Sequence, residues 1–324
     1  ELTGAMAIER NAALMIVRRT ENEGDYNYFF VTDKALSNHS LSSKDGTYGL
    51  PLVVPHDIFP TKVSPNIAPG FAARVAALTG LAWDDCIEGP KQGALSGVLP
   101  KKAEQVAMFD APRRERGESG KSFGPRDLFD YIYAVLHSPA YRARYADYLK
   151  SDFARIPMPG SRALFEALVP IGTELVSLHL LDDALPILKD PKTVRLAGSG
   201  EARIDIAAAK FEAKHDGTDA GACRGDRMHI GANRWFESVP RAAADFHVGG
   251  YQPARKWLKD RAPKSGKPGR VLTAEDIIHY RRMITALTRT AELMPQIDAV
   301  IEKHGGWPGA FRGMTDDAQA EAAE

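Results

Sequence analysis

Short apolar runs separated by polar stretches characterise the first part of the chain. The runs AALMIVRR (12–19) and YNYFFVTDKAL (26–36) are enriched in Val, Ile, Tyr and Phe, and they predict two strands. The polar stretch from Leu36 to Pro51 contains a DG turn signal and is predicted to be a loop. The prolines from Pro51 to Pro69 then predict a segment without regular structure.

Helical spacing of apolar residues begins in the next part of the chain. Residues 70–81 predict a short helix, whereas 86–122 has no clear period and predicts a long, partly disordered loop. Three further helices follow. Pro125 suits the first helical position of the first, Ser138 caps the second, and Pro170 bends or restarts the third.

Strand-like patterns separated by Gly- and Asp-rich turns return after residue 190. They cover the segments TVRLAG (193–198), ARIDIAAAKFEAK (202–214), DRMHIGANRWFESVP (226–240) and ADFHVGG (244–250). Gly249–Gly250 predicts a turn at the end of the last strand, and Gln252–Pro253 predicts the start of a helix. Thr273 and Asp276 resemble a capping box, and the apolar spacing after them predicts a long helix.

These elements predict an α+β fold, in which a helical part and a mostly antiparallel β part are interleaved and a long C-terminal helix closes the chain. We expect six segments: an N-terminal β segment (1–65), a short helix with a flexible insert (66–122), a helical block (123–185), a β-rich recognition part (186–262), the C-terminal helix (263–312) and a frayed tail (313–324).

Composition changes this picture little. The 42 basic and 42 acidic residues cancel, although the bases concentrate between Arg224 and Arg270, where they could form a basic face. The two cysteines, Cys86 and Cys223, are isolated thiols typical of a reducing compartment. No apolar run is long enough for a bilayer, so we expect a cytoplasmic protein without a membrane partner. A first residue Glu1 instead of Met suggests a piece of a longer protein.

Catalytic patterns are sparse. The stretch RERGESGKS resembles a phosphate loop, but it carries Glu115 where the first glycine should stand, which argues against nucleotide binding. Asp205 followed by Glu212 and Lys214 matches the skeleton of a magnesium nuclease, in which carboxylates hold the metal and the lysine polarises water. The plainer interpretation is a surface strand with alternating charges. No metal site and no catalytic residue is therefore assigned.

Three blocks together resemble one protein family. They are DLFDYIYAVLHSPAYRARYADYLKSDFARIPMP (127–159), RWFESVP (234–240), and FHVGGYQPARKWLKDR followed by LTAEDIIHYRRMITALTRTAELMPQID. These blocks are similar to the C-terminal specificity region of type ISP single-chain restriction–modification enzymes and related adenine-N6 DNA methyltransferases. NAALMIVRR, YFFVTDK and YGLPLVV resemble the segment that follows the methyltransferase core in that family.

The resemblance implies sequence-specific recognition of double-stranded DNA. In that family an upstream methyltransferase domain of the same polypeptide transfers methyl from S-adenosylmethionine to adenine N6, and some members add nuclease activity. This chain lacks the Asn-Pro-Pro-Tyr motif and a cofactor loop, so we expect it to bind no cofactor and to be non-catalytic alone.

Polar and basic loops supply candidate DNA contacts, because Lys and Arg neutralise phosphates and polar side chains reach base edges. The candidates are Asn38, His39, Ser43, Lys44, Arg224, Arg227, Asn233, Arg255, Lys256, Lys259 and Arg261. In the stretch GGYQPARKWLKDR we expect Trp257 and Leu258 to face inward and the basic residues to face outward. A stand-alone magnesium nuclease and an interdomain docking scaffold remain alternative functions.

Overall fold

The structure is a computed structural model that describes residues 11–21, 26–34, 40–42, 44–55, 63–85, 116–191, 194–205, 210–212 and 226–312. It divides into two compact units. Unit 1 comprises residues 1–176 and 295–324, and unit 2 comprises 177–294. The predicted α+β class is confirmed, and a long helix, α11 (Ala274–Lys303), lies near the C-terminus.

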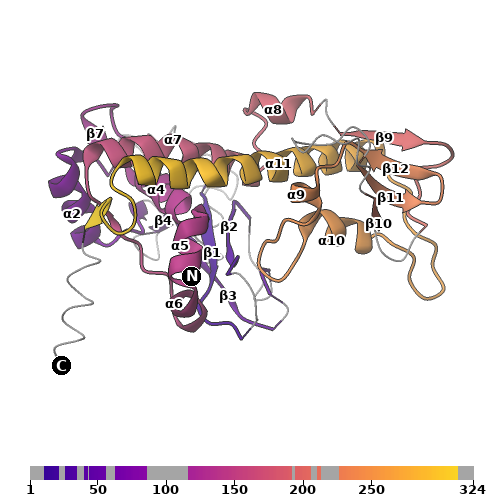
Figure 1. Cartoon of the computed structure of the whole chain (residues 1–324), viewed down its shortest axis with the longest axis horizontal. Coiled ribbons are helices and arrows are strands. Elements are labelled where there is room, and N and C mark those ends of the chain that lie inside the picture. The colour runs from indigo at the N-terminus through magenta and orange to yellow at the C-terminus, as the bar shows by residue number, and fades with distance from the viewer. Residues whose placement is uncertain are drawn as a thin grey trace, which may run out of the picture. The chain divides into compact units, whose positions relative to one another are not determined.

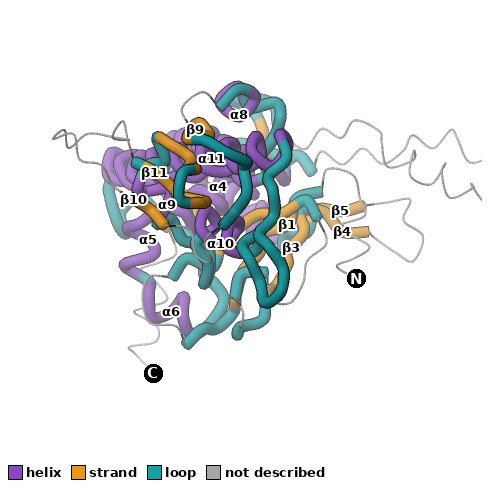
Figure 2. The backbone as a smooth tube through the Cα atoms, turned by 90° about the vertical axis from the view of Figure 1, so that its right-hand side faces the viewer, coloured by secondary structure: helices purple, strands orange, loops and turns teal. Residues whose placement is uncertain are grey.

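A three-stranded antiparallel sheet forms part of unit 1, in the order β2-β1-β3. Strand β1 (Ala13–Val17) is buried along its whole length and pairs with β2 (Phe29–Thr32) and β3 (Thr47–Pro51), as Figure 2 shows for β1 and β3. The two predicted strands are confirmed. The loop predicted up to Pro51 is wrong at its end, because β3 is an edge strand whose apolar residues Tyr48 and Leu50 stay exposed.

The proline-rich segment also contains regular structure. Strands β4 (Val53–Pro55) and β5 (Val63–Pro65) pair with each other, and each ends at a proline, where the missing N–H does not interrupt the pairing. The predicted helix is confirmed as α2 (Pro69–Thr79), which ends at Gly80 with a φ of 68°. Strand β6 (Ala82–Trp83) pairs in parallel with β7 (Ser122–Phe123). Most of the loop predicted at 86–122 lies outside the described residues.

The helical block follows its predicted signals. Helix α4 (Pro125–His137) starts at its proline, and α5 (Pro139–Arg144) is capped by the Ser138 hydroxyl, which accepts the Tyr141 amide at 3.0 Å. Helix α6 (Ala146–Ser151) follows. Helix α7 (Arg162–His179) contains Pro170 and does not restart there. The short strand β8 (Met158–Pro159) pairs with β13 (Phe311–Arg312).

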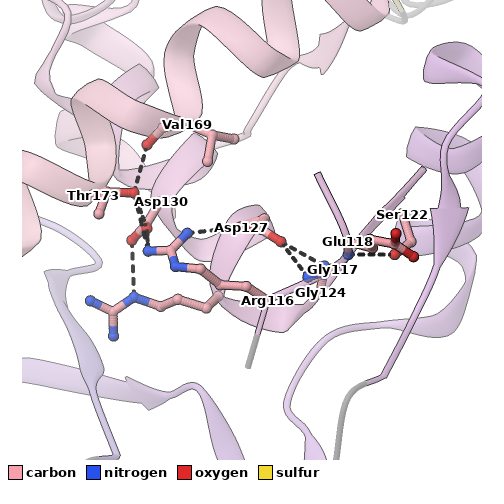
Figure 3. Close-up of polar contacts among 10 residues, drawn as sticks. Arg116, Gly117, Glu118, Ser122, Gly124, Asp127, Asp130, Val169 and Thr173 are labelled. Carbon is pink, nitrogen blue, oxygen red and sulfur yellow. Dashed lines mark hydrogen bonds and ion pairs between the residues drawn. The ribbon is translucent and has the colours of Figure 1, made fainter. Parts of the chain in front are cut away.

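A buried carboxylate in unit 1 anchors the end of the insert (Figure 3). Asp130 on α4 is fully buried and accepts hydrogen bonds from Arg116 at 2.5 Å, Arg126 at 3.1 Å and the Thr173 hydroxyl at 2.7 Å. Arg116 also donates to Asp127 at 2.7 Å. Burial disfavours the charged guanidinium, but these two carboxylates outweigh it and raise the pKa of Arg116. Residues 116–122 are therefore tied to the helical block.

Unit 2 contains a four-stranded antiparallel sheet in the order β10-β11-β12-β9. The strands are β10 (Lys210–Glu212), β11 (Arg227–Gly231), β12 (Arg234–Glu237) and β9 (Arg195–Gly198). The short helices are α8 (Pro186–Lys189), α9 (Arg241–Ala244) and α10 (Pro253–Lys259).

One face of this sheet packs against helices to form the core of unit 2 (Figure 1). Met228 and Phe236 are opposite each other in β11 and β12, and both are fully buried. Phe236 contacts Tyr280 of α11 with 4.3 Å between ring centroids, and Tyr280 contacts Trp257 of α10 at 5.3 Å. Leu258 is buried in the same cluster. The inward orientation predicted for Trp257 and Leu258 is thus confirmed.

The segment between β12 and α10 departs from prediction. ADFHVGG (244–250) does not form a strand, because its start closes helix α9 and its end is a tight turn. Val248 and Tyr251 exchange backbone hydrogen bonds at 2.9 and 3.2 Å around Gly249, which has a φ of 57°. The predicted turn and the helix start at Pro253 are both present.

Candidate nucleic-acid interface

The face of the unit 2 sheet opposite the core carries aromatic and charged residues that are partly buried. Successive strand residues point to opposite faces, so Arg227, His229 and Trp235 lie on the side away from the core residue Met228. The Arg227 guanidinium is 4.3 Å from the centroid of the Trp235 ring. His229 Nε2 lies 2.7 Å from a carboxylate oxygen of Glu212 on the neighbouring strand. The contact with Trp235 therefore holds the Arg227 side chain against the sheet surface.

The connection between β11 and β12 presents Asn233 to solvent. The backbone carbonyl of Asn233 accepts the Ser199 amide at 2.9 Å, and Arg234 donates to the Gly198 carbonyl at 2.7 Å. A Cβ on Gly198, whose φ is 94°, would lie 2.1 Å from the Asn233 carbonyl oxygen. These contacts fix the backbone of the turn while its amide side chain remains exposed.

Two of the three bases of α10 are paired with acids. Arg255 contacts Asp245 at 2.8 Å, and Lys256 contacts Asp260 at 2.8 Å. Burial opposes ionisation of Asp245, but the hydrogen bonds and charges of Arg255 and Arg241 together outweigh this effect and lower the pKa of Asp245. Lys259 is exposed, and its side chain forms no ion pair with any described residue.

Arg261 packs between α10 and the start of α11. Its guanidinium lies 3.7 Å from the centroid of the Trp257 ring and donates to the Trp257 carbonyl at 3.0 Å. Its Nε is 3.9 Å from Asp276, and burial lowers the pKa of Arg261. Thr273 and Asp276 form the reciprocal bonds of the predicted capping box at 3.1 Å each. Arg261 thus supports the helix junction, and its contact with DNA stays a prediction.

A short linking segment lies between β11 and the residues that follow the loop after α10. The backbone amide of Asp205 donates a hydrogen bond to the Ile230 carbonyl in β11 at 2.8 Å. The backbone amide of Ile204 donates to the Arg270 carbonyl at 3.1 Å. Arg270 in turn donates its amide to Arg261 at 2.9 Å. Arg270 is consequently separated from β11 by about two strand spacings, roughly 10 Å. These backbone bonds thus connect the residues after the loop at 262–269 to β11, the strand that leads into the turn at Asn233.

The predicted contact residues do not form one cluster. Asn233 lies in the turn between β11 and β12, Lys259 and Arg261 lie at and just after the end of α10, and Arg227 lies on the sheet face opposite the core. Lys44 is exposed in unit 1. The predicted residues Asn38, His39, Ser43 and Arg224 lie outside the described residues.

Sequence reasoning missed Trp235 on the sheet face beside Arg227, and it missed the exposed lysines of the loop at 262–269. The KSGK pattern at Lys264–Lys267 was the available signal, because two bases flanking a Ser-Gly pair indicate a basic turn.

The three residues of the nuclease-like pattern lie only partly within the described part of the chain. Asp205 is exposed, Glu212 contacts His229, and Lys214 lies outside the described residues. Within the described ranges no group of three or more His, Cys, Asp or Glu side chains is arranged to hold a metal ion. Of the helices in the described part of the chain, none is both long and apolar enough to span a membrane.

Residues 1–296 match the family model described as Type ISP C-terminal specificity domain. The chain belongs to this family. The type ISP specificity domain is the DNA target-recognition part of type ISP restriction–modification enzymes, so the resemblance seen in the sequence is confirmed. A comparison with curated proteins found no match.

Solved structures share the fold of this specificity domain. The ATP-dependent type ISP restriction–modification enzyme LlaBIII bound to DNA has 17% identity and a TM-score of 0.53, with 89% of this chain and 16% of that chain covered. The DrdV–DNA complex has 17% identity and a TM-score of 0.54, with 91% of this chain and 25% of that chain covered. The specificity domain thus spans a quarter or less of these two proteins.

Proposed function

We propose that this specificity domain reads its DNA target through the end of unit 2 that carries Asn233. The observation that supports this is an exposed amide side chain on a turn whose backbone is held by β9. Base recognition needs a side chain free to reach a base edge and a backbone that does not move away. Asparagine pairs with two atoms of adenine in the major groove, and a bidentate contact of this kind contributes about 1–3 kcal/mol of discrimination.

The basic residues around this turn hold the backbone of the duplex. Lys259 follows the paired bases of α10, and the adjoining loop contains further lysines. Phosphate contacts set register and orientation without reading sequence. This division of roles places base reading at the turn and anchoring at the neighbouring cations.

The parent protein we infer is an adenine-N6 DNA methyltransferase in the cytoplasm, with or without endonuclease activity. Its upstream methyltransferase domain would bind S-adenosylmethionine and act on the site that this domain selects. The support is the family membership and the small share of LlaBIII and DrdV that the chain spans.

Fluorescence anisotropy with a random-sequence duplex pool, measured at two salt concentrations, tests the proposed function. We expect binding that weakens steeply with salt, and sequencing of the recovered DNA should show an enriched motif. Asn233→Ala should relax one position of that motif without changing the thermal melt. Lys189→Ala, an exposed change on α8, is the control.

The outcomes separate the competing functions. Binding that does not depend on salt, or no binding at low salt, would reject direct DNA recognition and favour the docking scaffold. An unchanged motif with Asn233→Ala would reject only the assignment of base reading to this turn.

A further inference from the structure

A basic hairpin follows α10 in unit 2. Lys264 and Lys267 form two backbone hydrogen bonds with each other, at 3.2 and 2.7 Å, around Ser265 and Gly266. Gly266 has a φ of 73°, a conformation that other residues rarely adopt. All four residues of this turn are exposed. The chain therefore presents a closed, regular turn to solvent instead of an irregular loop.

The stem of the hairpin is firmly anchored. The Arg270 amide bonds to Arg261, and the Arg270 carbonyl accepts the Ile204 amide at 3.1 Å. Gly269 lies so close to this linking segment that a Cβ there would come within 1.6 Å of the Ile204 carbonyl oxygen. Arg270 also contacts Asp276 at 2.9 Å. Because the stem is bound on two sides, the turn has a defined position relative to Asn233.

The lysines of the turn, like Lys259, differ from the acid-paired bases of this region. Arg255, Lys256 and Arg270 each contact an acid, whereas Lys264 and Lys267 have no ion pair with any residue that the structure describes. Their backbone pairing brings two like charges opposite each other, an arrangement that destabilises a sheet. An anion between the two ammonium groups would turn this repulsion into attraction.

We propose that the turn Lys264–Lys267 is a phosphate clamp that anchors the DNA backbone beside the base-reading turn at Asn233. This inference deepens the proposed function and rests on it. The two ammonium groups hold one or two phosphates of a single strand, and the Ser265 hydroxyl is a further donor at the turn. The clamp contributes affinity and register but no base preference.

Salt titration of the complex tests the clamp directly. Each phosphate contact contributes about 0.9 to the slope of log K against log salt. The double variant Lys264→Gln/Lys267→Gln should reduce this slope by about 1 to 2, weaken binding equally for matched and unmatched duplexes, and leave the enriched motif and the melt unchanged. Lys264→Arg/Lys267→Arg should retain the full slope.

A matched control accounts for the loss of net charge. Lys189→Gln/Lys303→Gln removes two exposed lysines from α8 and α11 and should leave the slope within about 0.5 of the original, because neither lysine belongs to the hairpin.

Two results would overturn the clamp while the proposed function stands. In the first, the wild-type chain binds DNA and the Lys264→Gln/Lys267→Gln variant has the same salt slope. In the second, this variant and the Lys189→Gln/Lys303→Gln control lose the same amount of salt slope. Absence of salt-dependent binding by the wild-type chain would overturn both.

Discussion

Asp130 offers the sharpest test of how unit 1 is held together. The substitution Asp130→Asn keeps the size of the side chain but removes the charge that faces Arg116 and Arg126. The carboxylate is fully buried and accepts bonds at 2.5, 3.1 and 2.7 Å, the last from Thr173. An amide can still accept from one of these donors, but its own NH2 group then faces a guanidinium.

The magnitude follows from the exposure of the partners. Removing one member of a buried ion pair typically costs about 3–5 kcal/mol, because the other charge remains desolvated. Here the Arg116 side chain is 38% exposed and can regain water, whereas that of Arg126 is 14% exposed. We therefore expect a loss near the lower end of that range, about 3 kcal/mol of unfolding free energy.

Urea denaturation measures this loss. With a slope of about 1–3 kcal/mol per molar urea, the unfolding midpoint of the affected transition should fall by about 1–3 M. Arg116→Ala and the double variant complete a cycle, and we expect a coupling of at least about 1 kcal/mol between these two side chains. Asp147→Asn, at an exposed position of α6, serves as the control.

The expected contrast is large enough to be refuted. If the free energies of unfolding of the Asp130→Asn and Asp147→Asn variants differ by less than about 0.5 kcal/mol, the buried network does not stabilise unit 1 in the way its geometry suggests. Additive effects of Arg116→Ala and Asp130→Asn would likewise show that their contact is energetically neutral.

Two further predictions concern the base of the hairpin. Gly269→Ala should cost about 1–3 kcal/mol, because its Cβ would meet the Ile204 carbonyl oxygen; an unchanged thermal melt would contradict this close approach. Asp276→Asn should lower the free energy of unfolding most near neutral pH. Burial raises the pKa of Asp276, but bonds from Thr273 and the charge of Arg270 bring it below 3.8, so its stabilisation is complete above 3.8 and disappears as the pH falls through the folded value. Urea midpoints of wild type and variant should converge in acid, and a constant difference would refute the linkage.

Local signals predicted the elements whose stability depends on nearby residues. Ser138 before Pro139 and the pair Thr273–Asp276 cap their helices as expected, because a capping bond spans only a few residues. Trp257 and Leu258 face the core because apolar spacing defines one side of a helix.

Features that depend on distant partners could not be predicted in this way. Strand β3 (TYGLP) contains a glycine and ends in a proline, so its sequence is a weak strand signal, and β1 supplies its hydrogen bonds. The contact of Arg116 with Thr173 spans 57 positions, and no local pattern encodes it. The same limit applies to the candidate interface, since the Asp245 partner of Arg255 lies in a segment predicted to be a strand.

The pairing of bases with acids explains how a chain with equal numbers of positive and negative residues can bind DNA locally. A phosphate that approaches Arg255 or Lys256 must compete with Asp245 or Asp260, and an exposed ion pair contributes about 0–1 kcal/mol, so the exchange yields little net affinity. The hairpin lysines lack this competition among the described residues, and each phosphate contact there releases counterions without breaking an ion pair. The strength of binding should therefore follow the few cations that the fold leaves unpaired, and not the total number of bases in the region.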